Sequence, residues 1–102
     1  MSLGNARIKP TATTATTLLE ATADTVISSI IVTNLSGSMT SFRIAIRPLG
    51  ATLSDSHYIY YDLPIDGNDT FVLTAGLTLQ ATDIVEVYAT LGTLSFNIFY
   101  TT

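Results

Sequence analysis

The segment Ser41–Arg47, SFRIAIR, carries the clearest secondary-structure signal in the chain. Large apolar residues occupy every second position, namely Phe42, Ile44 and Ile46, and Pro48 follows the run. Successive side chains of a β-strand point to opposite faces, so this spacing predicts a strand with one face in a hydrophobic core. Proline has no backbone N–H to donate and is expected to end the strand.

Runs of similar character lie on both sides of this segment. They are rich in β-branched and aromatic residues, and most are separated by Gly, Pro, Asp, Asn or Ser. The expected strands are Thr16–Glu20, Val26–Asn34, His57–Leu63, Thr70–Thr74, Leu77–Leu79, Ile84–Ala89 and Thr93–Thr101. No helical period interrupts them. The sequence therefore predicts an all-β fold, an antiparallel β-sandwich of seven to eight strands with immunoglobulin-like or jelly-roll topology.

The domain organisation follows from length and from the first ten residues. A chain of 102 residues is long enough for one hydrophobic core and short for two. Residues 1–10 have no apolar periodicity and end at Pro10. We expect them to form an N-terminal arm that is disordered in the isolated protein, followed by a single β-sandwich domain over residues 11–102.

The segment Val26–Asn34 has apolar residues on both faces of the expected strand. In a regular strand Val26, Ile30 and Val32 would share one face, and Ile27 and Ile31 the other. This pattern is typical of a strand that is covered on both sides.

Charge argues against several classes of partner. The net charge is −4, and the only basic residues are Arg7, Lys9, Arg43 and Arg47. A nucleic-acid partner is not expected, because phosphate binding needs a cationic stripe. No apolar run approaches the roughly 20 residues of a membrane span, so no membrane partner is expected. The first residues lack the apolar core of a signal peptide and the chain has no cysteine, which favours synthesis in a reducing cytoplasm.

Two segments contain residue types found in functional sites. Residues 54–57, Ser-Asp-Ser-His, include those of a hydrolase triad, but a triad is assembled from distant segments. Residues 62–69 offer several oxygen ligands around Gly67, yet they lack the distal glutamate of a calcium-binding EF-hand loop. Loop and turn chemistry explains both segments. We therefore expect a non-enzymatic protein with no catalytic residue, cofactor or metal.

Apolar residues on the strand faces that are expected to point to solvent indicate a contact surface. Phe99 lies opposite the inward row of Leu94, Phe96 and Ile98, and Ile84 and Tyr88 lie opposite Val85 and Val87. Only 12% of residues are charged, which gives weak protection against association. Arg7 and Lys9 place half of the basic charge in the expected arm, where it could meet an acidic surface. The predicted partner interface is Phe99, Tyr88, Ile84, Arg7 and Lys9.

Several strand and turn segments resemble those of small bacteriophage virion structural proteins. The segments are Ser29–Asn34, Phe42–Pro48, Tyr58–Pro64, Asn68–Phe71 and Gly76–Asp83. The resemblance runs from about Thr25 to Phe99. It implies a structural role in the virion and no active site.

Among virion roles, the first hypothesis is a capsid decoration (cement) protein that binds the outer shell. Its partners would be the major capsid protein and further copies of itself, with a trimer as the first hypothesis for the homo-oligomer. One alternative is a tail, collar or baseplate component. Another is a carbohydrate-binding attachment module, in which Tyr58, Tyr60 or Tyr61 would stack on sugar rings.

Overall fold

The computed structural model describes residues 1–102 and consists of nine strands and two short 3-10 turns. The strands are β1 (Leu3–Ile8), β2 (Thr16–Glu20), β3 (Thr25–Asn34), β4 (Thr40–Arg47), β5 (Tyr58–Ile65), β6 (Thr70–Leu73), β7 (Thr78–Leu79), β8 (Ile84–Ala89) and β9 (Leu94–Thr101). The turns η1 (Pro48–Gly50) and η2 (Asp55–His57) lie between β4 and β5. Every strand expected from the sequence is present, within two residues at each end.

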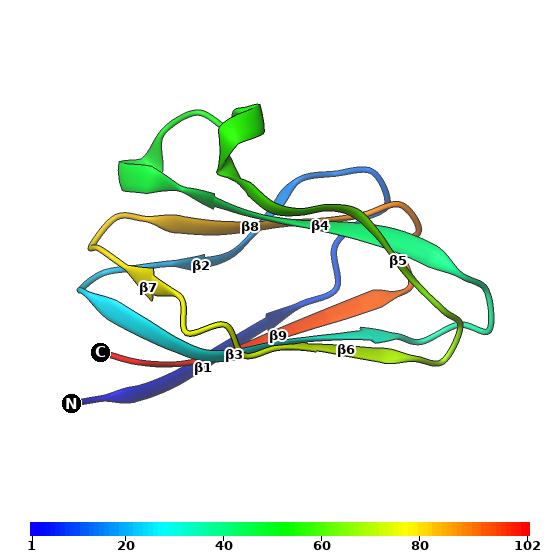
Figure 1. The fold of residues 1–102 in the computed structure, drawn as a ribbon, viewed down its shortest axis with the longest axis horizontal. Coiled ribbons are helices and arrows are strands. Elements are labelled where there is room, and N and C mark those ends of the chain that lie inside the picture. Colours follow the sequence, from blue (N-terminus) through cyan, green and yellow to red (C-terminus); the bar gives the residue numbers. More distant parts are fainter.

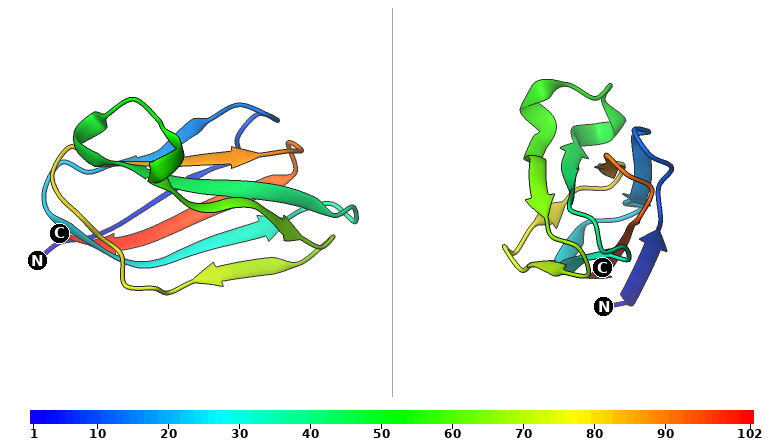
Figure 2. Two further views of the ribbon diagram at one scale, coloured as in Figure 1. Left: turned by 45° about the horizontal axis from the view of Figure 1, so that its top comes forward. Right: turned by 90° about the vertical axis from the view of Figure 1, so that its right-hand side faces the viewer.

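The strands form two antiparallel sheets packed face to face (Figures 1 and 2). Sheet I has the order β1-β9-β3-β6, with β7 also paired to β3, and sheet II has the order β2-β8-β4-β5. The pairs are nested: β1 pairs with β9, β2 with β8, β3 with β6 and β7, and β4 with β5. A nested hairpin that rolls into two sheets is a jelly roll. The expected β-sandwich is confirmed, and its strand order is that of the jelly roll.

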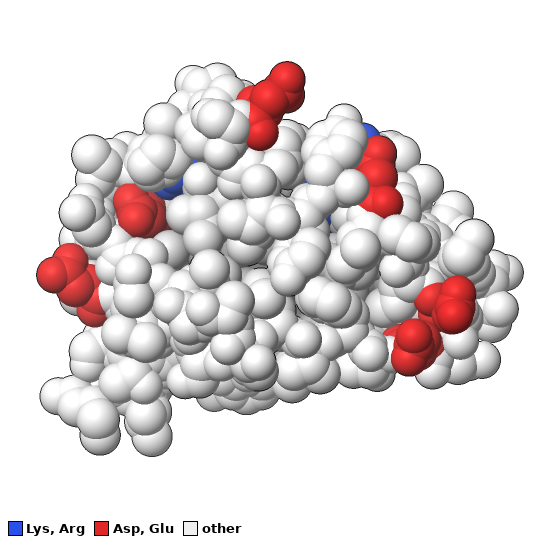
Figure 3. Space-filling model, viewed as in Figure 1, with Lys and Arg blue, Asp and Glu red and all other residues white.

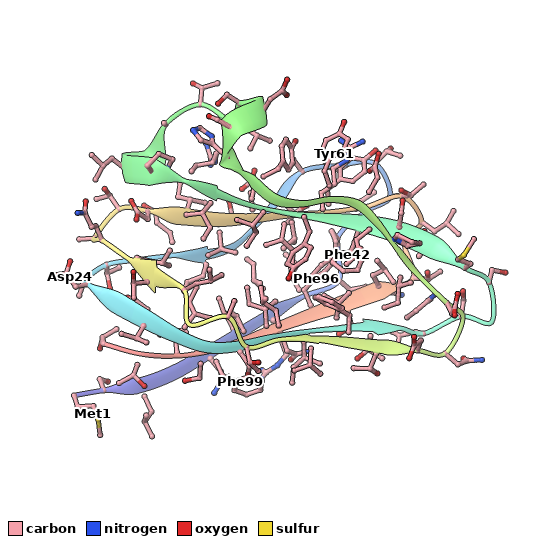
Figure 4. The ribbon with its side chains drawn as sticks, in the orientation of Figure 1. Met1, Asp24, Phe42, Tyr61, Phe96 and Phe99 are labelled. Carbon is pink, nitrogen blue, oxygen red and sulfur yellow. The ribbon has the colours of Figure 1, made fainter.

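The core lies between the two sheets and contains the inward row of SFRIAIR. Phe42 and Ile44 are fully buried, and the Phe42 ring lies 6.0 Å from that of Phe96 on the opposite sheet. Figure 4 shows both rings between the two layers. Ile46, nearer the end of β4, is partly buried and packs against the same core. The segment is therefore a strand with one face in the hydrophobic core, as its alternation predicts.

The expected N-terminal arm is wrong for most of its length. Leu3–Ile8 forms β1, which pairs with β9 over six consecutive residues without a bulge. Ala6 and Ile8 pack against the core, and Ser2 exchanges two backbone hydrogen bonds with Thr102. The sandwich therefore begins at Leu3. Its inward row is Gly4, Ala6 and Ile8, and the two small residues in that row hid the alternation of this strand.

The expected face assignment of β3 is also wrong. A bulge between Ile27 and Ser29 inserts one residue, so the side chains after it change face. Ile27, Ile30 and Val32 all point inward as a result, and Val26 and Ile31 point outward. The strand is buried on one face, and Val26 is 53% exposed on the other.

Irregular pairing also changes which side chains of β5 face inward. Its register against β4 shifts twice, and Asp62 has a positive φ of 52°. Tyr60 faces inward and packs against Phe42 and Phe71. Tyr58 and Tyr61 lie together on the outside, with ring centroids 4.9 Å apart. A regular alternation of side chains would place Tyr58 with Tyr60, and the register shifts separate the two.

Candidate interaction surfaces

The outer face of sheet I, called here the sheet I face, carries rows of side chains that cross several strands. One row runs through Arg7, Asn97, Ile31 and Val72 on β1, β9, β3 and β6. A second contains Asn5, Phe99 and Ser29, and a third contains Leu3, Thr101, Val26 and Thr78. Each row mixes apolar and small polar residues, which is the composition of many protein–protein contact surfaces.

Several apolar side chains on this face are open to solvent. The exposed fraction is 38% for Phe99, 55% for Val72 and 78% for Leu3. The molecule is 38 Å long and 20 Å wide along this face, a footprint of roughly 760 Å². A standard protein–protein interface buries about 800 Å² on each partner, so the sheet I face is large enough for one.

The sheet I face is almost uncharged. Arg7 is the only charged residue within the five strands of the sheet. Its guanidinium donates to Oδ1 of Asn5 at 2.9 Å and of Asn97 at 3.4 Å. In Figure 3 acidic side chains lie near the top and at both ends of the molecule, and none lies along the lower edge, where sheet I runs. A partner that covers this face would therefore remove little charge from water.

The outer face of sheet II has a different character, because most of its charges are paired. The Arg43 guanidinium lies 2.7 Å from the Asp62 carboxylate and stacks on the Tyr61 and Tyr88 rings, at 4.2 and 4.1 Å from their centroids. The hydrogen bond that Arg43 donates to Asp62 raises the pKa of Arg43 above its ordinary value. Glu86 lies 3.7 Å from Arg47 and accepts from the Thr17 hydroxyl. Four of the five charged side chains in the strands of sheet II are thus paired within the chain, and the exposed Glu20 is the exception.

The structure divides the predicted interface between the two sheets. Phe99 and Arg7 lie on the sheet I face, and Lys9 is exposed just after β1. Ile84 and Tyr88 are half-buried on the outside of sheet II, beside the Arg47–Glu86 and Arg43 contacts. The five residues therefore do not form one patch, because β8 and β9 belong to different sheets although they are neighbours in sequence. Val26 and Val72, both more than half exposed on the sheet I face, were missed.

The residues 54–57 form a turn and not a nucleophile–base pair. The Ser54 backbone N–H donates to Nδ1 of His57 at 3.1 Å, which assigns the proton of the neutral ring to Nε2. Nε2 is the nitrogen nearest the Ser54 hydroxyl, at 3.4 Å, and a general base needs a free lone pair there. The Asp55 carboxylate makes no hydrogen bond to His57.

Two of the candidate oxygen ligands in residues 62–69 bind groups within the chain. Asp62 binds Arg43, and Oδ1 of Asp69 accepts from the Thr70 backbone N–H at 2.8 Å. Nowhere in the structure do three His, Asp or Glu side chains lie close enough together to hold a metal ion.

No protein-family model matches the sequence, and no curated protein matches it. No helix of the structure is long and apolar enough to cross a membrane.

Proposed function

We propose that this protein is a non-enzymatic virion component, a capsid decoration (cement) protein that binds the outer shell through its sheet I face. The observation that carries the proposal is an open sheet face with exposed Phe99, Val26 and Val72 and a single charged residue. Apolar area left on a folded surface favours association, since its burial removes that area from water.

Two apolar side chains of β3 support the same conclusion. Val26 and Ile31 point outward on the sheet I face, and within the chain only the opposite face of the strand is covered. A partner on the sheet I face would supply the missing cover. Jelly rolls occur in capsid proteins and also in lectins and cupins, so the fold alone does not favour the virion. The resemblance to phage virion proteins supports it independently.

A map of virus particles that contain this chain tests the proposal directly. We expect one copy or a symmetric cluster of copies on the outer shell, with Phe99 and Val72 facing a capsid subunit or a neighbouring copy. Density on the tail, collar or baseplate would support that alternative role. Absence of the chain from purified particles would rule out both.

Occupancy on particles gives a second test. Particles produced with Phe99→Ser should carry less of the protein, because the substitution removes the largest exposed side chain of the sheet I face. Ile59→Ser on β5, which removes a side chain of similar exposure (39%) from sheet II, is the control and should leave occupancy unchanged.

A further inference from the structure

We propose that the hollow between η2 and the start of β5 is a binding site for a neutral sugar. It is an open depression of about 470 Å³ lined by Asp55, Tyr58 and Tyr61. This volume falls within the ~300–1,000 Å³ of small-molecule sites. The site is on the sheet II side, away from the sheet I face, and does not depend on the shell-binding role.

The two tyrosine rings form a corner with free polar groups around it. Their planes meet at 82° with centroids 4.9 Å apart, and Tyr61 is 58% exposed. Neither phenol hydroxyl and neither oxygen of the Asp55 carboxylate has a hydrogen-bond partner within the chain. A pyranose offers a C–H face that packs on an aromatic ring and hydroxyls that donate to a carboxylate. The hollow presents both kinds of partner.

The neighbouring contacts hold Tyr61 in place before any ligand arrives. Arg43 stacks on Tyr61 at 4.2 Å while its Nε donates to Asp62, the next residue along β5. Figure 4 shows Tyr61 on the outside of the upper sheet, opposite the core ring of Phe42. A ring fixed in this way loses little conformational freedom on binding, which favours affinity.

A carboxylate with two aromatic rings is also the chemistry of a cage for an organic cation. Here Arg43 already occupies one face of the Tyr61 ring, 4.2 Å from its centroid, so that face cannot take a second cation and the rings cannot enclose one. A sugar needs only one free ring face. The carboxylate of Asp55 disfavours acidic sugars by charge repulsion.

Titration of the ¹⁵N-labelled full chain with methyl glycosides of glucose, galactose, mannose and N-acetylglucosamine tests this inference. We expect at least one to cause saturable amide shifts that centre on residues 55–61. Tyr61→Ala should weaken that binding on the order of tenfold. Asp55→Asn should weaken it too, whereas the matched control Asp24→Asn, an exposed acid on the β2–β3 connection that does not line the hollow, should not.

Two outcomes would overturn the inference. In the first, no glycoside shifts residues 55–61, or the shifts survive in Tyr61→Ala. In the second, tetramethylammonium chloride binds at these residues and the glycosides do not, which would assign the hollow to cations. The spectrum of each variant also shows whether its fold is intact, so a misfolded variant cannot be mistaken for loss of binding. Tyr61→Phe, which keeps the ring, should retain most of the affinity.

Discussion

The two phenylalanines of β9 have opposite environments. Phe96 is fully buried against Phe42, whereas Phe99 is 38% exposed on the sheet I face. Phe96→Ser should lower the free energy of unfolding by about 3–5 kcal/mol, because it leaves a cavity and buries a hydroxyl. Phe99→Ser should cost about 1 kcal/mol or less. Thermal melts of the two variants check this, and equal destabilisation would show that both faces of β9 contribute to the core.

Gly67 is required for the contact between two loops. The Asn68 backbone N–H donates to the Ser36 carbonyl at 2.8 Å, and a Cβ at position 67 would overlap backbone atoms of Gly37. Gly67→Ala should therefore destabilise the protein by about 1–3 kcal/mol. Gly37→Ala is the matched control. A Cβ at position 37 would meet only the Asn68 side chain, at 3.8 Å. The free energy of unfolding of Gly37→Ala, measured by urea denaturation, should therefore lie within about 0.5 kcal/mol of the parent value.

The faces of individual residues could be predicted wherever a strand is regular. In β8 and β9 the alternation placed Val85, Val87, Phe96 and Ile98 inward, and all four are buried. In β3 and β5 it failed after one or two positions, because a bulge shifts every later side chain to the other face. A bulge inside β3 leaves no clear mark on the sequence, since Ser28 and Ser29 are ordinary strand-compatible residues.

At the scale of elements, the nested strand order makes β1 an edge strand of sheet I and not a free N-terminal arm. It covers the edge of β9, and its removal would leave the backbone donors and acceptors of β9 unpaired. Deletion of Met1–Lys9 should lower the melting temperature and promote aggregation. The double variant Arg7→Ala, Lys9→Ala keeps the strand and removes its charges, so it should melt close to the parent. An unchanged melting temperature after the deletion would show that β1 contributes nothing to the fold.

One loop–loop contact depends on a buried carboxylate. Asp83, before β8, accepts from the backbone N–H of Leu49 at 2.8 Å and of Gln80 at 2.9 Å. Its two oxygens thus tie η1, where Leu49 has a φ of 52°, to the turn after β7. Asp83→Ala should cost about 2–4 kcal/mol, since two backbone donors lose a charged partner. Asp24→Ala on an exposed turn is the control, and calorimetry of both variants measures the difference.

The turn signals at Leu35–Thr40, Pro64–Asp69 and Ala81–Asp83 allowed strand number and order along the chain to be predicted. These local signals could not predict which distant strands pair. The β1–β9 and β2–β8 pairs join residues at opposite ends of the sequence. That pairing decides which outward residues share a surface. The sequence therefore indicated that a contact surface exists, but it combined residues of two opposite faces into one site.

At the scale of the whole molecule, the two outer faces differ in how their polar groups are satisfied. Sheet II pairs four of its five charged side chains internally, whereas sheet I leaves apolar side chains in water around one arginine. If sheet I drives self-association, Val72→Lys should abolish it, because a cation on this face would be buried in the contact without a partner. Ile59→Lys makes the same change of charge on β5 and should associate like the parent.

Sedimentation velocity over a range of concentrations measures this association. The parent chain and Ile59→Lys should increase in mass together as concentration rises, and Val72→Lys should remain a monomer at every concentration. The mass of the largest species then gives the number of subunits and tests the expected trimer. A parent that stays monomeric throughout would assign the sheet I face to a different protein. Equal loss of association in both lysine variants would show that net charge, and not this face, controls contact between copies.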